Sequence, residues 1–277
     1  MNKINSMTQG FFKIYICIFL SLISFSTLKA TNSQFPLTSI DYYKNLTLFG
    51  VETTLSPLSW TENEWKSTSL IIGAGLIGYM VETDIKNWIN DQNSDLISNI
   101  GKIGDSIGSP YFLLPLTASM AGYGFLSSNS KLTKTSIHAF SAGLITGGLT
   151  KGMKALFNRH RPSSGDDHNM FDGPSLSGDE ESQSFPSGHS SVTWAIATIF
   201  AENYKNNSII YYGAYGFSTF VSISRSFHNE HWISDIIIGS ALGHFVAKSV
   251  LADYKISKSI KFSPILTSSA VGGKLNF

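Results

Sequence analysis

The sequence predicts an all-α protein, with a single helical-bundle domain of about six core helices and short irregular or β-prone flanks. Hydrophobic residues make up 42% of the 277 positions, which is enough for a sizeable core. From Trp65 onward, apolar runs alternate with short polar joints, and their length and Gly, Ala and Ser spacing favour helices over strands. The predicted helices cover residues 67–81, 106–126, 136–160, 190–204, 207–223 and 232–254.

The charge balance limits the classes of partner. A formal net charge of +1 gives no overall basic field, so nucleic-acid binding has no electrostatic basis in this sequence. Any anion-binding site must therefore be local. Charged residues make up only 14% of the chain and aromatic residues 13%, which is typical of a membrane-adjacent or tightly packed helical protein.

The N-terminal residues 1–30 are predicted to be a signal peptide. Lys3 and Lys13 precede an apolar run over 14–25, which has the length of a signal-peptide core and is short for a membrane span. An uncleaved N-terminal anchor is the alternative. The only cysteine, Cys17, lies in this run, so a cleaved chain has no thiol and cysteine chemistry is excluded as the mechanism.

The segments on either side of the helical domain have less regular patterns. Residues 31–64 mix Pro, Ser, Thr and aromatic residues without a sustained period, which predicts an irregular lead-in. The helical domain is expected over 65–254. The tail, 255–277, holds short β-prone pieces separated by Pro264 and two glycines, which is compatible with an irregular segment or a short strand pair.

Two long stretches carry no Asp, Glu, Lys or Arg, namely residues 106–130 and 206–224. A membrane-spanning helix needs about 20 mostly apolar residues. Ser, Thr, Gly and other weakly apolar residues dilute both stretches, however. We therefore expect a soluble or peripherally attached helical domain in preference to an integral one.

Lys154 and Arg161 begin the part of the sequence with recognisable chemistry. They stand seven residues apart, which is two helical turns, so the pattern predicts both side chains on one face of a helix that Pro162 ends. Two cations on one face can bind an anion. The alternative is a solvated basic helix end, where Lys and Arg interact with the helix dipole.

Residues 163–185 form a predicted loop with six acidic residues and neither Lys nor Arg. Within it, Asp166, Asp167 and His168 raise the alternative of a metal site. Adjacent side chains diverge, however, and a hard cation needs spaced oxygen ligands. A solvated acidic flap is the preferred interpretation, and no metal is predicted.

The loop ends in Pro186-Ser187-Gly188-His189, directly before an apolar helical run. Ser187 and Gly188 at a helix start offer unpaired backbone N–H groups, and the helix dipole favours an anion there. His189, at the same edge, would face the anion and could give a proton to a leaving oxygen. An inert histidine near the helix N-terminus is the alternative.

Arg225, His231 and Asp235 stand at fixed spacing before the last apolar run. If the chain is helical from His231, this residue shares a face with Asp235, whose carboxylate can hydrogen-bond one ring nitrogen. The other nitrogen is then free to act as a base or nucleophile. Arg225 adds a planar guanidinium suited to oxyanions. Taken alone, a buried His–Asp pair beside an arginine is more often structural.

Together, the three stretches resemble the tripartite signature of the type-2 phosphatidic acid phosphatase superfamily. The matching positions are Lys154, Arg161 and Pro162, then Pro186-Ser187-Gly188-His189, then Ser224, Arg225, His231 and Asp235, and none departs from the signature. This superfamily includes bacterial acid phosphatases, lipid phosphate and lipid A phosphatases, undecaprenyl pyrophosphate phosphatases, glucose-6-phosphatase and vanadium haloperoxidases.

The resemblance implies a metal-independent phosphatase without a cofactor. His231 would be the nucleophile that forms a phosphohistidine, Asp235 would hold its far nitrogen, and His189 would protonate the leaving oxygen and later activate water. The remaining matching residues would bind the phosphate oxygens: Lys154, Arg161, Ser187, the Gly188 amide and Arg225.

The expected substrate is a phosphorylated small molecule or a lipid phosphate or pyrophosphate, hydrolysed in the bacterial periplasm or cell envelope, with a membrane surface as a further partner. An integral inner-membrane protein with a periplasm-facing site is the alternative location. The alternative activity is a haloperoxidase that holds vanadate in the same pocket, although haloperoxidases tend to be longer. A non-enzymatic helical scaffold would make every motif position a coincidence.

Overall fold

The structure, a computed structural model, describes residues 62–92, 95–176, 179–259, 261–267 and 270–276. In these ranges the prediction of a helical fold is confirmed. The predicted signal peptide and nearly all of the lead-in lie outside the described residues. The described helices are α3 (Glu62–Gln92), α4 (Asp95–Gly108), α5 (Pro110–Leu126), α6 (Ser130–Phe157), α7 (Gly188–Asn203), α8 (Ser208–Phe227) and α9 (Ile233–Ser259).

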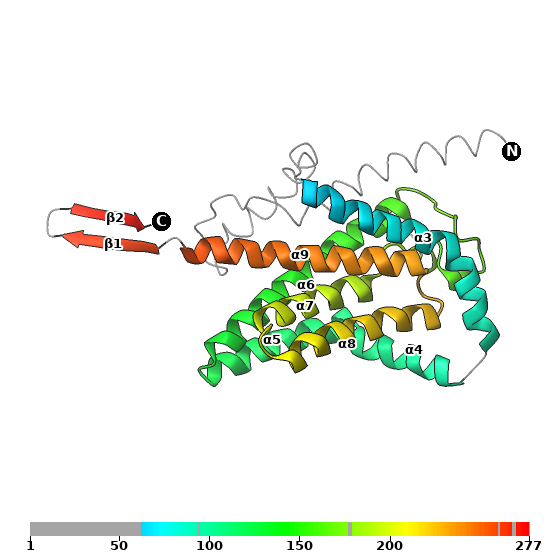
Figure 1. Ribbon diagram of the computed structural model, residues 1–277, viewed down its shortest axis with the longest axis horizontal. Helices are drawn as coiled ribbons and strands as arrows, with labels where there is room; N and C mark the ends of the chain where they lie inside the picture. Colours follow the sequence, from blue (N-terminus) through cyan, green and yellow to red (C-terminus); the bar gives the residue numbers. More distant parts are fainter. Residues whose placement is uncertain (1–61, 93–94, 177–178, 260, 268–269, 277) are drawn as a thin grey trace. The chain divides into compact units, whose positions relative to one another are not determined.

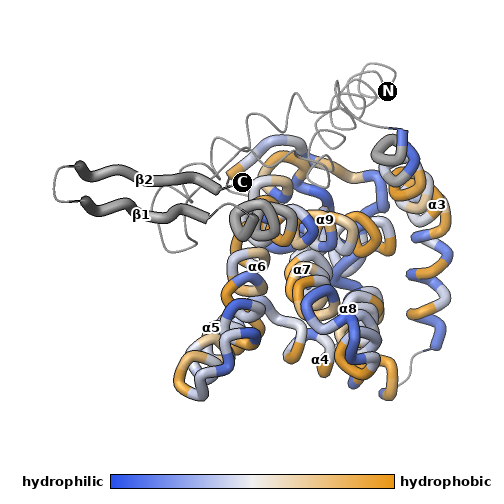
Figure 2. The backbone as a smooth tube through the Cα atoms, turned by 60° about the vertical axis from the view of Figure 1, so that its left-hand side comes forward, coloured by the Kyte–Doolittle hydropathy of each residue, from blue (hydrophilic) through white to orange (hydrophobic). Residues whose placement is uncertain are grey.

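Helices α4 to α8 form a bundle in which most consecutive helices pack against each other. Helix α5 packs on α6, α6 on α7 and α7 on α8, while α4 packs mainly along α8. Figure 1 shows α6, α7 and α8 side by side, and Figure 2 shows the same helices foreshortened. Short connections join α4 to α5, α5 to α6 and α7 to α8, as is usual for neighbouring antiparallel helices, whereas the longer segment 158–187 joins α6 to α7.

Helix α9 approaches α7 closely through two glycines. A Cβ atom built on Gly239 would lie 2.6 Å from the carbonyl oxygen of Ser187, and one built on Gly243 would lie 1.9 Å from that of Ser191. Any larger residue at either position would push the two helices apart. The close approach brings the first turn of α9 against the first turn of α7, where the sequence analysis placed the anion site.

The prediction for residues 82–126 is partly wrong, because it omitted α4 and joined the end of α4 to α5. Helix α4 carries three charged residues, which interrupt its apolar pattern. It ends at Gly108 and α5 begins at Pro110. Ser109 caps α5 by accepting a hydrogen bond from the backbone N–H of Tyr111 at 3.3 Å, and proline suits the first position of a helix.

Helix α6 also ends earlier than predicted, at Phe157. Asn158 follows in the left-handed conformation, with φ 41°, and its backbone N–H bonds the carbonyl oxygen of Lys154. Its side-chain amide donates to the carbonyl oxygens of Ala155 and Gly173 at 3.0 and 2.8 Å. Asn158 therefore ends the helix and ties the following loop to it.

A two-stranded antiparallel hairpin follows α9 in the sequence. Strands β1 (Lys261–Thr267) and β2 (Ala270–Asn276) pair in register from Lys261 opposite Asn276 to Thr267 opposite Ala270.

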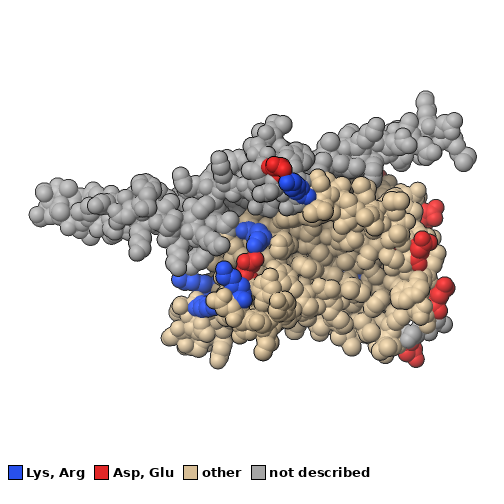
Figure 3. All heavy atoms as spheres, in the orientation of Figure 1, with Lys and Arg blue, Asp and Glu red and all other residues tan. Residues whose placement is uncertain are grey.

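Large apolar side chains are exposed on several helices. Among the described residues, two segments are long and apolar enough to cross a membrane, Thr68–Gln92 and Ile233–Leu251, and slightly more than half of the second is buried inside the protein. The face seen in Figure 3 has a broad region without Lys, Arg, Asp or Glu. Exposed apolar residues include Leu70, Ile77 and Met80 of α3, Tyr111, Phe125 and Leu126 of α5, and Ile209 and Tyr212 of α8.

Candidate active site

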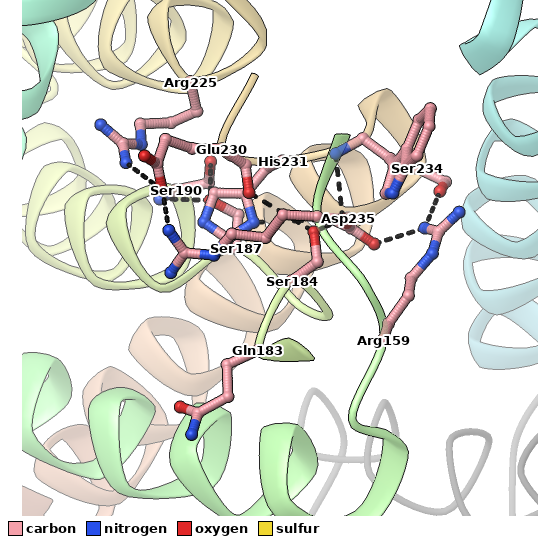
Figure 4. Close-up of polar contacts among 12 residues, drawn as sticks. Arg159, Gln183, Ser184, Ser187, Ser190, Arg225, Glu230, His231, Ser234 and Asp235 are labelled. Atoms are coloured by element: carbon pink, nitrogen blue, oxygen red, sulfur yellow. Dashed lines mark hydrogen bonds and ion pairs between the residues drawn. The ribbon is translucent and has the colours of Figure 1, made fainter. Parts of the chain in front are cut away.

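The three sequence stretches meet where α6 ends and where α7 and α9 begin (Figure 4). The backbone N–H of Ser187 donates to the carbonyl oxygen of Asp235 at 3.1 Å. Lys154 lies beside the same turn, because its Cε is 4.0 Å from the position that a Cβ on Gly188 would take. Its ammonium group donates to the carbonyl oxygen of Gln183. Residues from all three sequence motifs therefore lie close together at the start of α7.

Lys154 and Arg161 do not share a helix face, so that part of the prediction is wrong. Helix α6 ends at Phe157, and Arg161 reaches the site from the irregular segment beyond it, where its backbone N–H bonds the carbonyl oxygen of Glu181 at 2.7 Å. The two cations are nevertheless close enough to interact. Burial, followed by the charge of Arg161, lowers the pKa of Lys154 to about 7.

Arg161 and Arg225 share a carboxylate. Oε2 of Glu230 contacts Nη1 of Arg161 and lies 3.6 Å from Nη2 of Arg225, at the end of α8. The Nε atoms of both arginines are buried and have no hydrogen-bond partner in the part of the chain that the structure describes. A buried donor without a partner is costly. This pair of arginines is therefore suited to bind an oxyanion.

Ser187 caps α7, and His189 lies in the first turn of that helix. The hydroxyl oxygen of Ser187 accepts a hydrogen bond from the hydroxyl of Ser190 at 3.0 Å, so this side chain stabilises the helix start. Burial, followed by the charge of Arg225, lowers the pKa of His189 to about 4. His189 is therefore neutral at pH 7 in these surroundings.

The predicted hydrogen bond between His231 and Asp235 is not formed. Nδ1 of His231 lies 4.0 Å from Oδ2 of Asp235, because α9 begins at Ile233 and His231 precedes the helix. Burial and the charges of Lys154 and Arg225 lower the pKa of His231 well below its ordinary value. The ring is thus neutral, as a nucleophilic imidazole must be.

Asp235 is held by residues that the sequence analysis missed. Its Oδ1 accepts a hydrogen bond from Nη1 of Arg159 at 2.5 Å, and its Oδ2 accepts from the hydroxyl of Ser184 at 2.6 Å and from the backbone N–H of Trp232 at 3.0 Å. Figure 4 shows Asp235 between His231 and Arg159. The carboxylate is completely buried, so this network fixes its orientation.

Arg159 connects the site to α3. Its guanidinium also contacts Glu82 and donates to the hydroxyl of Ser234 at 2.8 Å and to the carbonyl oxygen of His168 at 2.7 Å. Arg159 stands two positions before Arg161, inside the first motif, so its position in the sequence offered a weak signal. Glu82 offered none, since it is 77 residues away and lies in an ordinary helical pattern.

Asp166 and His168, two of the three residues that suggested a metal site, have separate partners. Asp166 contacts Nδ1 of His160 at 2.7 Å, and Asp172 of the same loop contacts Nε2 of that ring at 2.9 Å. His168 instead contacts the hydroxyl of Thr83 at 3.0 Å. Over the described residues, no group of three or more His, Cys, Asp or Glu is arranged to hold a metal ion.

Three cations, two neutral histidines and the start of a helix lie close together, which suits the binding of an oxyanion. A comparison with protein families covers the same part of the chain. Residues 135–258 match the PAP2 superfamily. The chain is similar to this superfamily over these residues, which supports the resemblance drawn from the sequence motifs.

Curated relatives include two bacterial enzymes named lipid A 1-phosphatase. The one from Porphyromonas gingivalis is 27% identical over 190 residues, which cover 68% of this chain and 38% of that protein. The one from Rhizobium etli is 28% identical over 106 residues, covering 38% of this chain and 44% of that protein. The chain thus spans roughly two fifths of the length of the curated relatives it matches.

A solved structure is also similar, a transmembrane PAP2-type phosphatidylglycerolphosphate phosphatase from Bacillus subtilis. It is 18% identical, with a TM-score of 0.47, and the match covers 68% of this chain and 95% of that chain.

Proposed function

We propose that this protein is a metal-independent phosphatase, which hydrolyses phosphate monoesters or lipid phosphates through a phosphohistidine at His231. The observation that carries the proposal is that two neutral histidines lie close enough to the cations of the site for the charges to act on them. These cations are Lys154, Arg161 and Arg225. The similarity of residues 135–258 to the PAP2 superfamily supports it.

When the substrate binds, its phosphate replaces the carboxylate of Glu230 between Arg161 and Arg225. The phosphate oxygens are bound by Lys154, Arg161 and Arg225, together with the Gly188 amide at the start of α7. The carboxylate of Glu230 must leave its position between the arginines, because the phosphate oxygens need the same donors. Binding therefore satisfies the buried Nε donors that lack partners.

In the first chemical step, His231 attacks phosphorus with Nε2, since Nδ1 faces Asp235. The P–O ester bond breaks, its electron pair stays with the leaving oxygen, and that oxygen takes a proton from His189. Bound phosphate supplies the negative charge that raises the pKa of His189 from its value of about 4 in the empty site. Binding of the substrate thus favours the protonated form of His189, which is the form that acts as the acid.

In the second step, water attacks the phosphohistidine and His189 takes the proton of the water. The P–N bond breaks, its electron pair returns to His231, and inorganic phosphate leaves. Asp235 exchanges no proton in either step, and its carboxylate stabilises the positive ring of His231 in the intermediate.

The proposed substrate carries its phosphate at a membrane face, and the proposed location is the cell envelope, reached through the signal peptide at residues 1–30. The lipid A 1-phosphatase relatives support a lipid phosphate. The exposed apolar side chains of α3, α5 and α8 support attachment to a membrane. No observation on the site favours the haloperoxidase alternative.

The experiment that tests the function is a phosphate-release assay with the full chain purified in detergent. We expect release from 4-nitrophenyl phosphate and from micelles of a phosphatidate or lipid A phosphate. The His231→Ala protein, purified in parallel, is the control for contaminating phosphatases. Equal release by both proteins, or none by either, would refute the proposal.

A second assay tests the location. The chain without residues 1–30 is expressed and extracted first without and then with detergent. Recovery with the membrane fraction until detergent is added supports membrane attachment. Recovery in buffer alone would contradict attachment without affecting the proposed reaction.

A further inference from the structure

Asp105 of α4 touches two groups of the candidate site, although it belongs to none of the three sequence motifs. Its Oδ1 lies 2.5 Å from Nη1 of Arg225 and 3.2 Å from Nε2 of His189. The side chain of Asp105 is about half exposed, whereas those of the two partners are largely enclosed. The same carboxylate oxygen accepts a hydrogen bond from the proposed phosphate-binding arginine and lies within ion-pair distance of the proposed general acid. Nε2 of His189 is buried and makes no hydrogen bond among the described residues, so Asp105 is the group placed to pair with it once the ring is protonated.

The backbone fixes the position of Asp105. A Cβ atom built on the preceding residue, Gly104, would lie 1.8 Å from the hydroxyl oxygen of Ser224 in α8. No residue with a side chain fits there, so α4 and α8 are in close contact at this level. Because Ser224 immediately precedes Arg225, the glycine contact sets Asp105 beside the guanidinium and beside His189.

Arg225 does not depend on Asp105 for charge balance. The carboxylate of Glu230 lies 3.6 Å from Nη2 of Arg225 and serves this arginine as well. For His189, in contrast, Asp105 is the only carboxylate within 4.0 Å of a ring nitrogen among the described residues. When phosphate replaces the carboxylates as the partner of Arg225, the remaining partner of Asp105 is therefore His189.

The surroundings of His189 explain why it needs such a partner. Burial and the nearby charges of Arg225 and Lys154 disfavour its protonated form, and Asp105 opposes them. A general acid must carry its proton when the leaving oxygen departs. A carboxylate on one ring nitrogen stabilises the imidazolium ion and leaves the other nitrogen for the substrate.

We propose that Asp105 is the positioning residue of His189, holding its ring through Nε2 so that Nδ1 gives the proton to the leaving oxygen. The inference rests on the proposed phosphatase function. The proton moves from Nδ1 to the leaving oxygen as the P–O bond breaks, and Nδ1 takes a proton from water in the second step. Asp105 exchanges no proton in either step.

The test compares substrates that differ in their need for an acid. Asp105→Asn removes the charge and keeps the shape of the side chain. We expect kcat/KM for an alkyl phosphate to fall by about tenfold to a hundredfold, and that for 4-nitrophenyl phosphate to fall much less, because nitrophenolate leaves without a proton. Asp95→Asn, the same change in the first turn of α4, is the control and should alter neither substrate.

A double-mutant cycle with His189→Ala makes the test specific for the pair. If Asp105 acts through His189, Asp105→Asn should have almost no further effect once the histidine is gone. A full additional loss in the double variant would overturn the proposal, as would equal losses on the alkyl and aryl substrates. Wild-type protein that hydrolyses neither substrate would refute the phosphatase function itself.

Inhibition by orthovanadate provides a readout that does not depend on turnover. In Asp105→Asn, the inhibition constant measured with 4-nitrophenyl phosphate should stay the same or fall, because Arg225 loses an internal competitor for the anion. A tenfold rise would overturn the proposal, since Asp105 would then serve to hold Arg225 for phosphate.

Discussion

Arg159 and Asp235 form a buried ion pair at 2.5 Å, and both side chains are closed off from solvent. Oδ1 of Asp235 accepts from Arg159, whereas Oδ2 lies 4.0 Å from the ring of His231. The carboxylate next to the proposed nucleophile is therefore oriented by an arginine rather than by the histidine. Removing that arginine should affect both the fold and the chemistry.

The variant Arg159→Met should be strongly destabilised. It leaves the carboxylates of Asp235 and Glu82 buried without their cation, and breaking a buried ion pair in this way costs about 3–5 kcal/mol. Thermal unfolding in a fixed detergent measures the effect. Lys248→Met, which removes the cation of the exposed pair with Glu202, is the control and should cost at most about 1 kcal/mol. Comparable losses in the two variants would contradict the structural role of Arg159.

The variant His189→Ala should lose activity according to the leaving group. Alkyl and lipid phosphates need a proton on the departing oxygen, so their turnover should fall by roughly 10²–10⁴-fold. An aryl phosphate with a good leaving group should react faster in the first step than in the second, which gives a burst of alcohol release followed by slow turnover. Equal losses on both substrate types, without a burst, would mean that His189 only shapes the pocket.

The pH dependence of kcat/KM should reveal Lys154. Burial and the charge of Arg161 lower the pKa of Lys154 to about 7, so the empty site loses this positive charge as the pH rises through that value. Phosphate binds the charged form, and kcat/KM reports the free enzyme, so it should fall by up to about tenfold per pH unit above pH 7. Activity on 4-nitrophenyl phosphate between pH 5 and 9 measures it.

The matched variants for that measurement are Lys154→Arg and Lys151→Arg. A guanidinium stays charged over this pH range, so Lys154→Arg should lose the decline above pH 7 or move it upward. Lys151 is exposed on the same helix, and its replacement should leave the profile unchanged. An unaltered profile in Lys154→Arg would assign the decline to another group.

Removal of metal ions should leave the activity intact. Lys154, Arg161 and Arg225 supply the positive charge that a divalent ion provides in many other phosphatases. Exhaustive dialysis against a chelator, followed by the 4-nitrophenyl phosphate assay, measures this. Loss of activity that Mg²⁺ or Zn²⁺ restores would direct attention back to the loop with Asp166 and His168.

Vanadate should inhibit competitively, because its five-coordinate geometry resembles the transition state of phosphoryl transfer. The same vanadate-loaded protein, given bromide and hydrogen peroxide, should not oxidise the halide. Halide oxidation at a rate comparable to phosphate release would restore the haloperoxidase alternative.

Residue spacing along the chain singled out residues that the structure brings close together, and their catalytic roles stay a prediction. Lys154, His189, Arg225 and His231 lie at fixed positions relative to helix ends, and such local features are visible in a sequence. The helical class also followed from local patterns, namely long apolar runs with small residues. Helix ends were less accurate, because Asn158 and Ser109 terminate or cap helices through side-chain hydrogen bonds that an apolar pattern does not report.

The supporting residues could not be predicted, because they depend on contacts between distant segments. Asp105 lies 120 residues before Arg225, and its contact requires the close packing of α4 on α8 through Gly104. Glu82 similarly meets Arg159 only because α3 packs beside the site. The prediction of a hydrogen bond between His231 and Asp235 was wrong for a local reason, since nothing in the sequence pattern indicates that α9 starts after the histidine.

The most direct test of the central claim is to trap the phosphoryl group on His231. His189→Ala protein is mixed with a ³²P-labelled aryl phosphate, quenched rapidly under alkaline denaturing conditions and analysed for label on the chain. The account predicts label that is stable to base and labile to acid, as a P–N bond is, located on the peptide that contains His231. The double variant with His231→Ala should carry none. Turnover by wild-type protein without any such label, or the same label in the double variant, would contradict a phosphohistidine at His231.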